Sequence, residues 1–127
     1  MSLQILAVDD SRTIRDMLNL TLKQAGFTPH LADDGVHGVE VLEEMSPPPD
    51  AIITDINMPR MDGFGLIEAV RKIDKFRAVP ILVLTTESAT DLKQRARSAG
   101  ATGWIVKPFE PKNWFAPYIW SQDRRAP

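Results

Sequence analysis

Apolar residues in this chain gather in two kinds of segment that alternate along it. Five short runs are apolar almost throughout: QILAV (4–8), FTPHLA (27–32), AIIT (51–54), ILVL (81–84) and GWIV (103–106). Continuous apolar character, rather than strict alternation with polar residues, is typical of strands buried on both faces, as in a parallel sheet. The runs therefore predict five parallel strands.

Between these runs, apolar residues recur at helical spacing. We expect helices at 11–25, 35–45, 63–73 and 89–99, and a fifth that begins near Pro111. The apolar stripe predicted for the first helix comprises Ile14, Met17, Leu18, Leu22 and Ala25. Gly26 follows as a C-terminal stop.

The third and fourth predicted helices also have one apolar side. The third carries Leu66, Ile67, Val70 and Ile73 on that side. The fourth turns Ala89, Leu92, Ala96 and Ala99 inward and Lys93, Arg95 and Arg97 outward. A strand followed by a helix, five times over, predicts one α/β domain over 1–127, with helices on both faces of a parallel sheet in three layers.

Composition narrows the class of protein. The chain has 127 residues, 43% of them hydrophobic and 25% charged, a balance typical of globular domains. A net charge of −2 gives no electrostatic footprint for nucleic acid, and the absence of cysteine excludes disulfides and thiolate metal sites. The N-terminal segment is unlike a secretion signal, and no apolar stretch reaches the ~20 residues that span a bilayer. We therefore expect a cytoplasmic protein without membrane insertion.

Polar residues that could bind a ligand or take part in a reaction follow the ends of the predicted strands. Strand 1 ends in Asp9-Asp10, strand 3 in Asp55, strand 4 in Thr85-Thr86 and strand 5 in Lys107-Pro108. The C-terminal ends of parallel strands share one edge of the sheet, where ligands bind. Three acids, a hydroxyl and a lysine are therefore expected in one cleft. Each residue alone also has an ordinary explanation as a turn, cap or solvated residue, so the prediction depends on their joint placement.

An acid cluster of this kind favours a cation. Clustered carboxylates repel one another, and oxygen ligands without sulfur or histidine favour Mg²⁺, with Mn²⁺ as the alternative. Magnesium commonly shares its coordination with phosphate oxygens, which points to phosphoryl chemistry, and an aspartate can itself be the nucleophile. Asp55 is the candidate because turn-forming residues follow it in "MPRMDG".

Four segments, "AVDDS", "TDINMPRMDG", "LTTE" and "GWIVKPF", resemble in order and spacing the receiver domain of two-component response regulators. More narrowly, they resemble single-domain chemotaxis regulators of the CheY type. The resemblance covers about 4–112 and implies a flavodoxin-like (βα)5 fold with strand order 2-1-3-4-5.

The resemblance also implies residue roles. Asp55 would accept a phosphoryl group from a histidine kinase, and Asp9, Asp10, Asp55 and the backbone carbonyl of Asn57 would hold Mg²⁺. Lys107 would pair with phosphoryl oxygens, next to a cis Lys107–Pro108 bond. Thr85 and Trp104 would form the switch, and Asn57 and Glu87 would tune dephosphorylation. The implied protein is a switch rather than an enzyme, with a downstream partner such as the flagellar motor switch.

The C-terminal segment 113–127 departs from the family pattern. Pro117 falls inside the last expected helix, among Trp114, Phe115, Tyr118, Ile119 and Trp120. Proline in mid-helix removes a hydrogen bond and clashes with the preceding turn. The helix is therefore expected to stop near Ala116 or to kink, and the aromatics to favour a partner interface or self-association.

Other functions remain open at this point. One is a phosphate sink or phosphorelay intermediate that binds only the kinase and its partners. Another is an aspartate-nucleophile phosphatase, although such enzymes typically carry a second acid where this chain has Asn57. A flavin-binding protein is disfavoured, because Asp9-Asp10 would repel the phosphate of the flavin. His30 and His37 are expected to be structural or surface residues away from the cleft.

Overall fold

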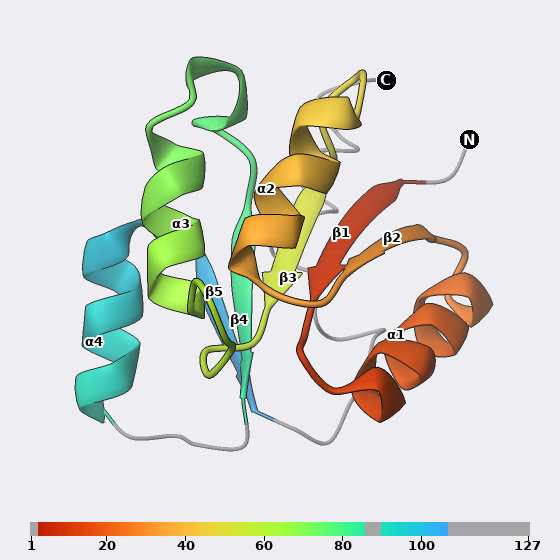
Figure 1. Ribbon diagram of the computed structural model, residues 1–127, viewed down its shortest axis with the longest axis horizontal. Helices are drawn as coiled ribbons and strands as arrows, with labels where there is room; N and C mark the ends of the chain where they lie inside the picture. Colours follow the sequence, from red (N-terminus) through yellow and green to blue (C-terminus); the bar gives the residue numbers. More distant parts are fainter. Residues whose placement is uncertain (1–2, 86–89, 107–127) are drawn as a thin grey trace.

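The computed structural model describes residues 3–85 and 90–106, which alternate between strands and helices (Figure 1). The elements are β1 (Gln4–Val8), α1 (Arg12–Gln24), β2 (Thr28–Ala32), α2 (Gly35–Glu44), β3 (Ala51–Thr54), α3 (Gly63–Arg71), a short 3-10 helix η1 (Asp74–Phe76), β4 (Ile81–Thr85), α4 (Thr90–Ala99) and β5 (Gly103–Val106). Each of the five apolar runs thus corresponds to one of the five strands, as predicted.

The strands form one parallel sheet in the order β2-β1-β3-β4-β5. This order and the flavodoxin-like architecture confirm the predicted fold. β1 and β3 lie next to each other although α1, β2 and α2 separate them in sequence. Both strands therefore end side by side, near the middle of the edge formed by the C-terminal ends of the strands.

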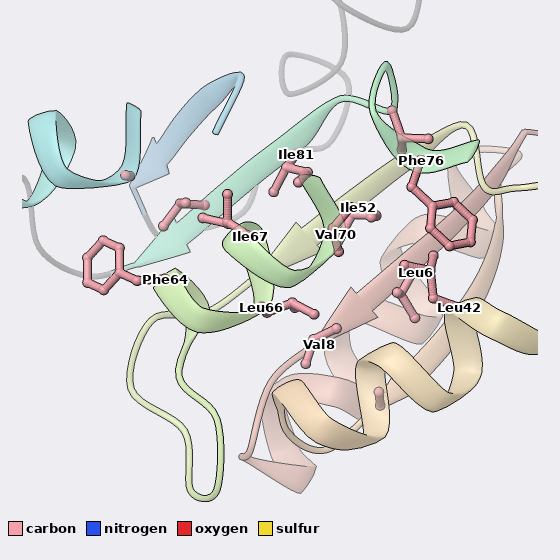
Figure 2. Close-up of a cluster of buried hydrophobic side chains, with 14 of the residues drawn as sticks. Leu6, Val8, Leu42, Ile52, Phe64, Leu66, Ile67, Val70, Phe76 and Ile81 are labelled. Atoms are coloured by element: carbon pink, nitrogen blue, oxygen red, sulfur yellow. The ribbon is translucent and has the colours of Figure 1, made fainter. Parts of the chain in front are cut away.

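The inner strands β1, β3 and β4 are buried on both faces, as the continuous apolar runs predict, whereas the edge strand β2 is half-buried up to Leu31. Successive strand residues point to opposite faces, so Leu6 and Val8 belong to one cluster while Ile5 and Ala7 belong to the other. The larger cluster lies between the sheet and α2, α3 and α4, and Figure 2 shows many of its side chains. The smaller cluster includes Leu18 and Leu22 of α1. Helices on both faces give the three predicted layers.

Three helices begin at a side-chain cap close to the strand ends. The N-cap residues Ser11, Asp34 and Asp62 each accept a hydrogen bond from the backbone amide three residues later. Such caps satisfy one of the amides that a helix start leaves unpaired. Each cap also fixes where the chain turns from the sheet edge into its helix.

Two predicted features of α1 and α3 are wrong. Met17 is 45% exposed and Ala25 is exposed, so the buried stripe of α1 is narrower than its apolar pattern suggests. The third helix ends at Arg71 rather than at residue 73, because the chain turns there into η1. η1 delivers Phe76, which is fully buried and whose ring points toward Leu6 and Leu42 in Figure 2.

The end of α3 is held by the side chain of Arg71. Its guanidinium donates to four backbone carbonyls and one hydroxyl: those of Phe76, Arg77, Val79 and Gly100, at 2.7–3.2 Å, and Thr102 Oγ1 at 3.4 Å. Burial lowers the pKa of Arg71 from its ordinary value. One side chain thus ties α3, η1 and the connection from α4 to β5 together.

Within the described ranges, no helix combines the length and apolar character needed to cross a membrane. The outward orientation predicted for Lys93, Arg95 and Arg97 of α4 is confirmed, and Ala96 is buried. The fifth predicted helix and the aromatic segment around Pro117 lie outside the described residues.

Candidate functional site

Asp9 and Asp55 stand side by side because of the register between β1 and β3. Val8 pairs with Thr54, so the residue after each strand emerges at the same height of the sheet edge. Hydrogen bonds continue past the strands, from Asp9 N to Ala32 O at 3.1 Å and from Asp55 N to Val8 O at 2.9 Å. The backbone under both carboxylates is therefore part of the sheet's hydrogen-bonding network.

Asp10 completes a cluster of three acids. One carboxylate oxygen from each of Asp9, Asp10 and Asp55 lies within 4.8 Å of the others. Asp9 is buried, Asp55 is half-buried and Asp10 is exposed. The predicted convergence of these three residues is confirmed, and the cluster is open to solvent on the side of Asp10.

Backbone amides orient two of the carboxylates. Ser11 N donates to Asp9 Oδ1 at 2.9 Å, and Ile56 N donates to Asp55 Oδ1 at 2.8 Å. Arg15 of α1 donates from Nη1 to the backbone carbonyl of Asp9 at 2.7 Å. These contacts fix the rotamers and the chain direction at the site, which is what a preorganised ligand set requires.

The loop after Asp55 is closed beneath it by Gly63. Gly63 N donates to Ile56 O at 2.8 Å. A Cβ atom at Gly63 would lie 2.3 Å from the carbonyl oxygen of Asp55 and 2.9 Å from Ile56 Cα. Only glycine permits this approach of two backbone segments, which is the physical role of the glycine in "MPRMDG".

The three carboxylates suit a small, hard divalent cation. Mg²⁺ prefers oxygen ligands at about 2.1 Å, so ligand atoms on opposite sides of the ion are about 4 Å apart. The three carboxylate oxygens lie within 4.8 Å of one another, near enough for one ion to be reached by all three after small side-chain movements. A cation would also relieve the mutual repulsion of the acids. The donor chemistry therefore fits Mg²⁺, and it fits Mn²⁺ in the same way.

The remaining predicted site residues are placed only in part. Asn57 is exposed in the loop after Asp55, and Thr85 ends β4 at the same edge of the sheet, although the structure does not describe its side chain. Glu87, Lys107 and the Lys107–Pro108 bond lie outside the described residues. Their assignments stay predictions.

Trp104 lies on the edge strand β5, where it pairs with Val83 of β4. Its half-buried side chain packs against the larger core cluster. Trp104 also lines a pocket of about 180 Å³ that includes Lys93 and Arg97 of α4. The residue thus contacts both the interior and a basic part of the surface.

The structure contains an ion pair between Arg60 and Asp34 that the sequence did not predict. Arg60, in the loop after Asp55, donates from Nε to Asp34 Oδ2 at 2.6 Å and from Nη2 to Asp34 Oδ1 at 2.9 Å. These hydrogen bonds hold the pKa of Asp34 below its ordinary value, although burial opposes them. In the sequence, each residue alone resembles an ordinary turn residue. No pattern near either residue predicts that the two form an ion pair.

The two histidines contact neighbours outside the acid cluster. His30 Nε2 lies 2.7 Å from Gln4 Oε1, at the start of β1. His37 of α2 lies with Nδ1 3.0 Å from Asp33 Oδ1. Both contacts fit the structural or surface roles that we expected.

Comparison with known proteins places this geometry in a family. Residues 5–116 match the family model described as the response regulator receiver domain. Two relatives from Helicobacter pylori are each 38% identical to the chain. The chemotaxis protein CheY1 aligns over 87% of this chain and 89% of its own length. The sensor histidine kinase CheAY aligns over 83% of this chain but over only 13% of its own length.

Solved structures agree with this relationship. The chemotaxis protein CheY4 of Vibrio cholerae superposes with a TM-score of 0.82 at 39% identity, covering 98% of both chains. The receiver domain of the sensor histidine kinase PA1611 from Pseudomonas aeruginosa, solved with a magnesium ion in its active site cleft, gives a TM-score of 0.78 at 25% identity. It covers 98% of this chain and 94% of that domain. By sequence and by fold, this chain belongs to the response regulator receiver domain family.

Proposed function

We propose that this protein is a phosphorylation-dependent switch of two-component signalling, in which Asp55 accepts a phosphoryl group from a histidine kinase. The observation that carries the proposal is the cluster of Asp9, Asp10 and Asp55, within 4.8 Å at the end of β1 and β3. Family membership supports the same function.

Asp55 acts as the nucleophile. A carboxylate oxygen of Asp55 forms a bond to the phosphorus of a phosphohistidine, the bond from phosphorus to the imidazole nitrogen breaks, and the imidazole takes up a proton from solvent. The product is an acyl phosphate on Asp55. The amide of Ile56, which donates to Asp55 Oδ1, holds the carboxylate in one orientation for this attack.

A divalent cation held by Asp9, Asp10, Asp55 and the backbone carbonyl of Asn57 supplies charge neutralisation for the phosphoryl oxygens. The carboxylate set fits Mg²⁺ and Mn²⁺ alike, and the magnesium ion in the PA1611 receiver domain favours Mg²⁺. Asp9 is the most buried of the three acids. Its negative charge is therefore less screened by water than the charges of Asp10 and Asp55.

The other predicted residues complete the proposal. Lys107 pairs with the phosphoryl oxygens, and Thr85 hydrogen-bonds to them once Asp55 is modified. Asn57 and Glu87 set the lifetime of the acyl phosphate. Trp104 transmits the state of Thr85 to partners, a role supported by its contact with both the core and the surface pocket beside α4.

The output is proposed to be a protein contact, most simply with a flagellar motor switch in chemotaxis, because CheY1 and CheY4 carry chemotaxis names. A phosphate sink or relay is the alternative within the same family, and CheAY is a relative whose own name is that of a kinase. An aspartate-nucleophile phosphatase is disfavoured because Asn57 offers no carboxyl group as a general acid.

Labelling with a small phosphodonor tests the proposal. The protein is incubated with acetyl phosphate and Mg²⁺ and analysed by intact-mass spectrometry. One base-labile phosphoryl group should appear on the wild type and should be lost in Asp55→Asn and on addition of a chelator. Undiminished labelling of Asp55→Asn, or continuous turnover of a generic phosphate ester, would contradict the assignment.

A pull-down separates the two roles in signalling. The protein is immobilised with and without a phosphoryl mimic, and captured proteins are probed for motor switch protein and for kinase. Capture of the motor switch protein only with the mimic would support the chemotaxis output. Capture of kinase alone in both states would favour the phosphate sink.

A further inference from the structure

The loop after Asp55 is tied to the start of α2 by the Arg60–Asp34 ion pair. Arg60 donates from Nε and Nη2 to the two carboxylate oxygens of Asp34, at 2.6 and 2.9 Å. The side chain of Asp34 is only 6% exposed, whereas that of Arg60 is 56% exposed. The pair therefore joins a buried, fixed acid to a residue on the outer side of the loop.

Asp34 is a rigid anchor for this contact. It is the N-cap of α2, and its Oδ1 also accepts from His37 N at 2.9 Å. A carboxylate held by a helix start and by burial loses little further freedom when Arg60 binds it. The pair thus differs from an exposed ion pair between two flexible side chains, whose contribution is small.

Backbone contacts show how closely the loop approaches α2. Gly35 N donates to Met61 O at 3.1 Å, and a Cβ atom at Gly35 would lie 2.6 Å from that oxygen. At the base of the loop, Gly63 N donates to Ile56 O. The loop is therefore closed at its base by Gly63 and held against the start of α2 at Met61.

The conformation of Arg60 argues that its side chain matters here. Arg60 has φ of 65°, and among the described residues it is the one non-glycine residue with positive φ. Glycine adopts this conformation without steric cost, whereas other residues are disfavoured in it. An arginine at this position is explained by what its guanidinium binds, because a turn alone would be better served by glycine.

We propose that Arg60 is a positioning residue whose ion pair with Asp34 holds the loop 56–62 against α2 and thereby sets the affinity of the acid site for a divalent cation. The inference rests on the proposed function, because it concerns the same site. The link is short: Asp55 precedes the loop directly, Ile56 N orients its carboxylate, and Asn57 lies in the next position.

Simple electrostatics predicts the opposite result, which makes the inference easy to test. Replacing Arg60 removes a positive charge and leaves Asp34 with an unpaired negative charge. Both changes would attract a cation more strongly to this end of the molecule. Weaker binding after the substitution therefore requires that the loop geometry has been lost.

The experiment measures Mg²⁺ affinity by calorimetric titration with MgCl₂ in the wild type, Arg60→Gly, Arg60→Lys and the double variant Arg60→Gly/Asp34→Asn. Glycine keeps the backbone conformation available, and asparagine keeps a cap for α2. We expect the dissociation constant to rise about three- to tenfold in Arg60→Gly, equally in the double variant, and less in Arg60→Lys. Arg77→Ala, which removes an exposed arginine at the far end of α3, is the matched charge control and should bind as the wild type does.

A second measurement reports the loop without any metal. Hydrogen exchange at the amides of Gly35 and Gly63 should accelerate in Arg60→Gly, because these amides bond across the two ends of the loop. Unchanged or tighter Mg²⁺ binding in Arg60→Gly would overturn the inference, and so would unchanged exchange at Gly35. Restored affinity in the double variant would also overturn it, because that variant lacks the ion pair as well and would then position the site without it. If the wild type binds Mg²⁺ but takes up no phosphoryl group, the proposed function fails while the role of Arg60 stands.

Discussion

Arg60 and Arg71 stand at opposite ends of α3 and hold the chain with different chemistry. Arg60 precedes the helix and binds the carboxylate of Asp34. Arg71 ends the helix, and in the described part of the chain its recorded partners are neutral oxygens: four backbone carbonyls and the hydroxyl of Thr102. A charged partner can be titrated or screened, whereas neutral carbonyls cannot.

The difference matches the position of each arginine relative to the acid site. The end of α3 near Arg60 adjoins the loop that follows Asp55, where geometry would affect the proposed binding of a cation and a phosphoryl group. The end near Arg71 lies where α3, η1 and the connection to β5 meet, so its contacts serve stability. We therefore expect substitutions at the two ends to separate function from stability.

The largest effect on stability is expected from Arg71→Ala. Losing the guanidinium leaves several partly buried carbonyls without a donor, at a cost of about 2–4 kcal/mol in the free energy of unfolding. Urea denaturation measures this loss, and Arg71→Lys should lose less because an ammonium still donates to some carbonyls. Mg²⁺ affinity of the folded protein should stay within about twofold of the wild type. A large loss of affinity would mean that the two ends are not separable.

Gly63→Ala should affect both properties, because the added Cβ would overlap the backbone of Asp55. We expect a loss of about 1–3 kcal/mol in stability together with weaker Mg²⁺ binding. Gly26→Ala is the control: φ is 91° there, so strain is added, but nothing lies within 4 Å of the new Cβ. That variant should lose stability in urea and keep its Mg²⁺ affinity. Equal losses of affinity in both variants would remove the special role of Gly63.

Acid should weaken the contact of Arg60 but not that of Arg71. Arg60 lowers the pKa of Asp34 from its ordinary value of 3.8, so the pair contributes stability above that pH. The contribution disappears as the pH falls through the lowered pKa of the folded state. The stability difference between wild type and Arg60→Gly should therefore shrink below about pH 4, while that for Arg71→Ala stays constant. Unfolding curves in urea at several pH values measure both differences, and parallel behaviour would contradict the comparison.

Salt should produce the smallest effect. At about 1 M NaCl, where the Debye length is ~3 Å, the exposed guanidinium of Arg60 is partly screened from Asp34. The stability difference between wild type and Arg60→Gly should fall slightly, and the difference for Arg71→Ala should not change. Thermal unfolding at low and high salt checks this result. A larger salt effect on Arg71→Ala would point to an unrecognised charged partner.

Sequence patterns predicted most of the architecture because they reflect burial directly. Continuous apolar runs indicated strands covered on both faces, and the structure contains all five. The same reasoning failed for Met17 of α1, which is 45% exposed. An apolar residue at helical spacing is buried only if the neighbouring layer reaches it, and the sheet covers a narrower strip of α1 than the pattern contains.

The amino-acid sequence by itself determined which residues can form the acid site. Asp9-Asp10 and Asp55 follow strands, and parallel strands end at one edge, so their placement at that edge follows from order along the chain, whereas their contact also needs β1 and β3 to be neighbours in the sheet. Only the tertiary structure decided which residues hold that site in place. Arg60 and Asp34 are 26 positions apart, as are many pairs of solvated residues, and their contact arises because the loop after β3 packs against the start of α2. A pattern of burial constrains each element locally, whereas the pairing of two polar side chains depends on where the elements meet in space.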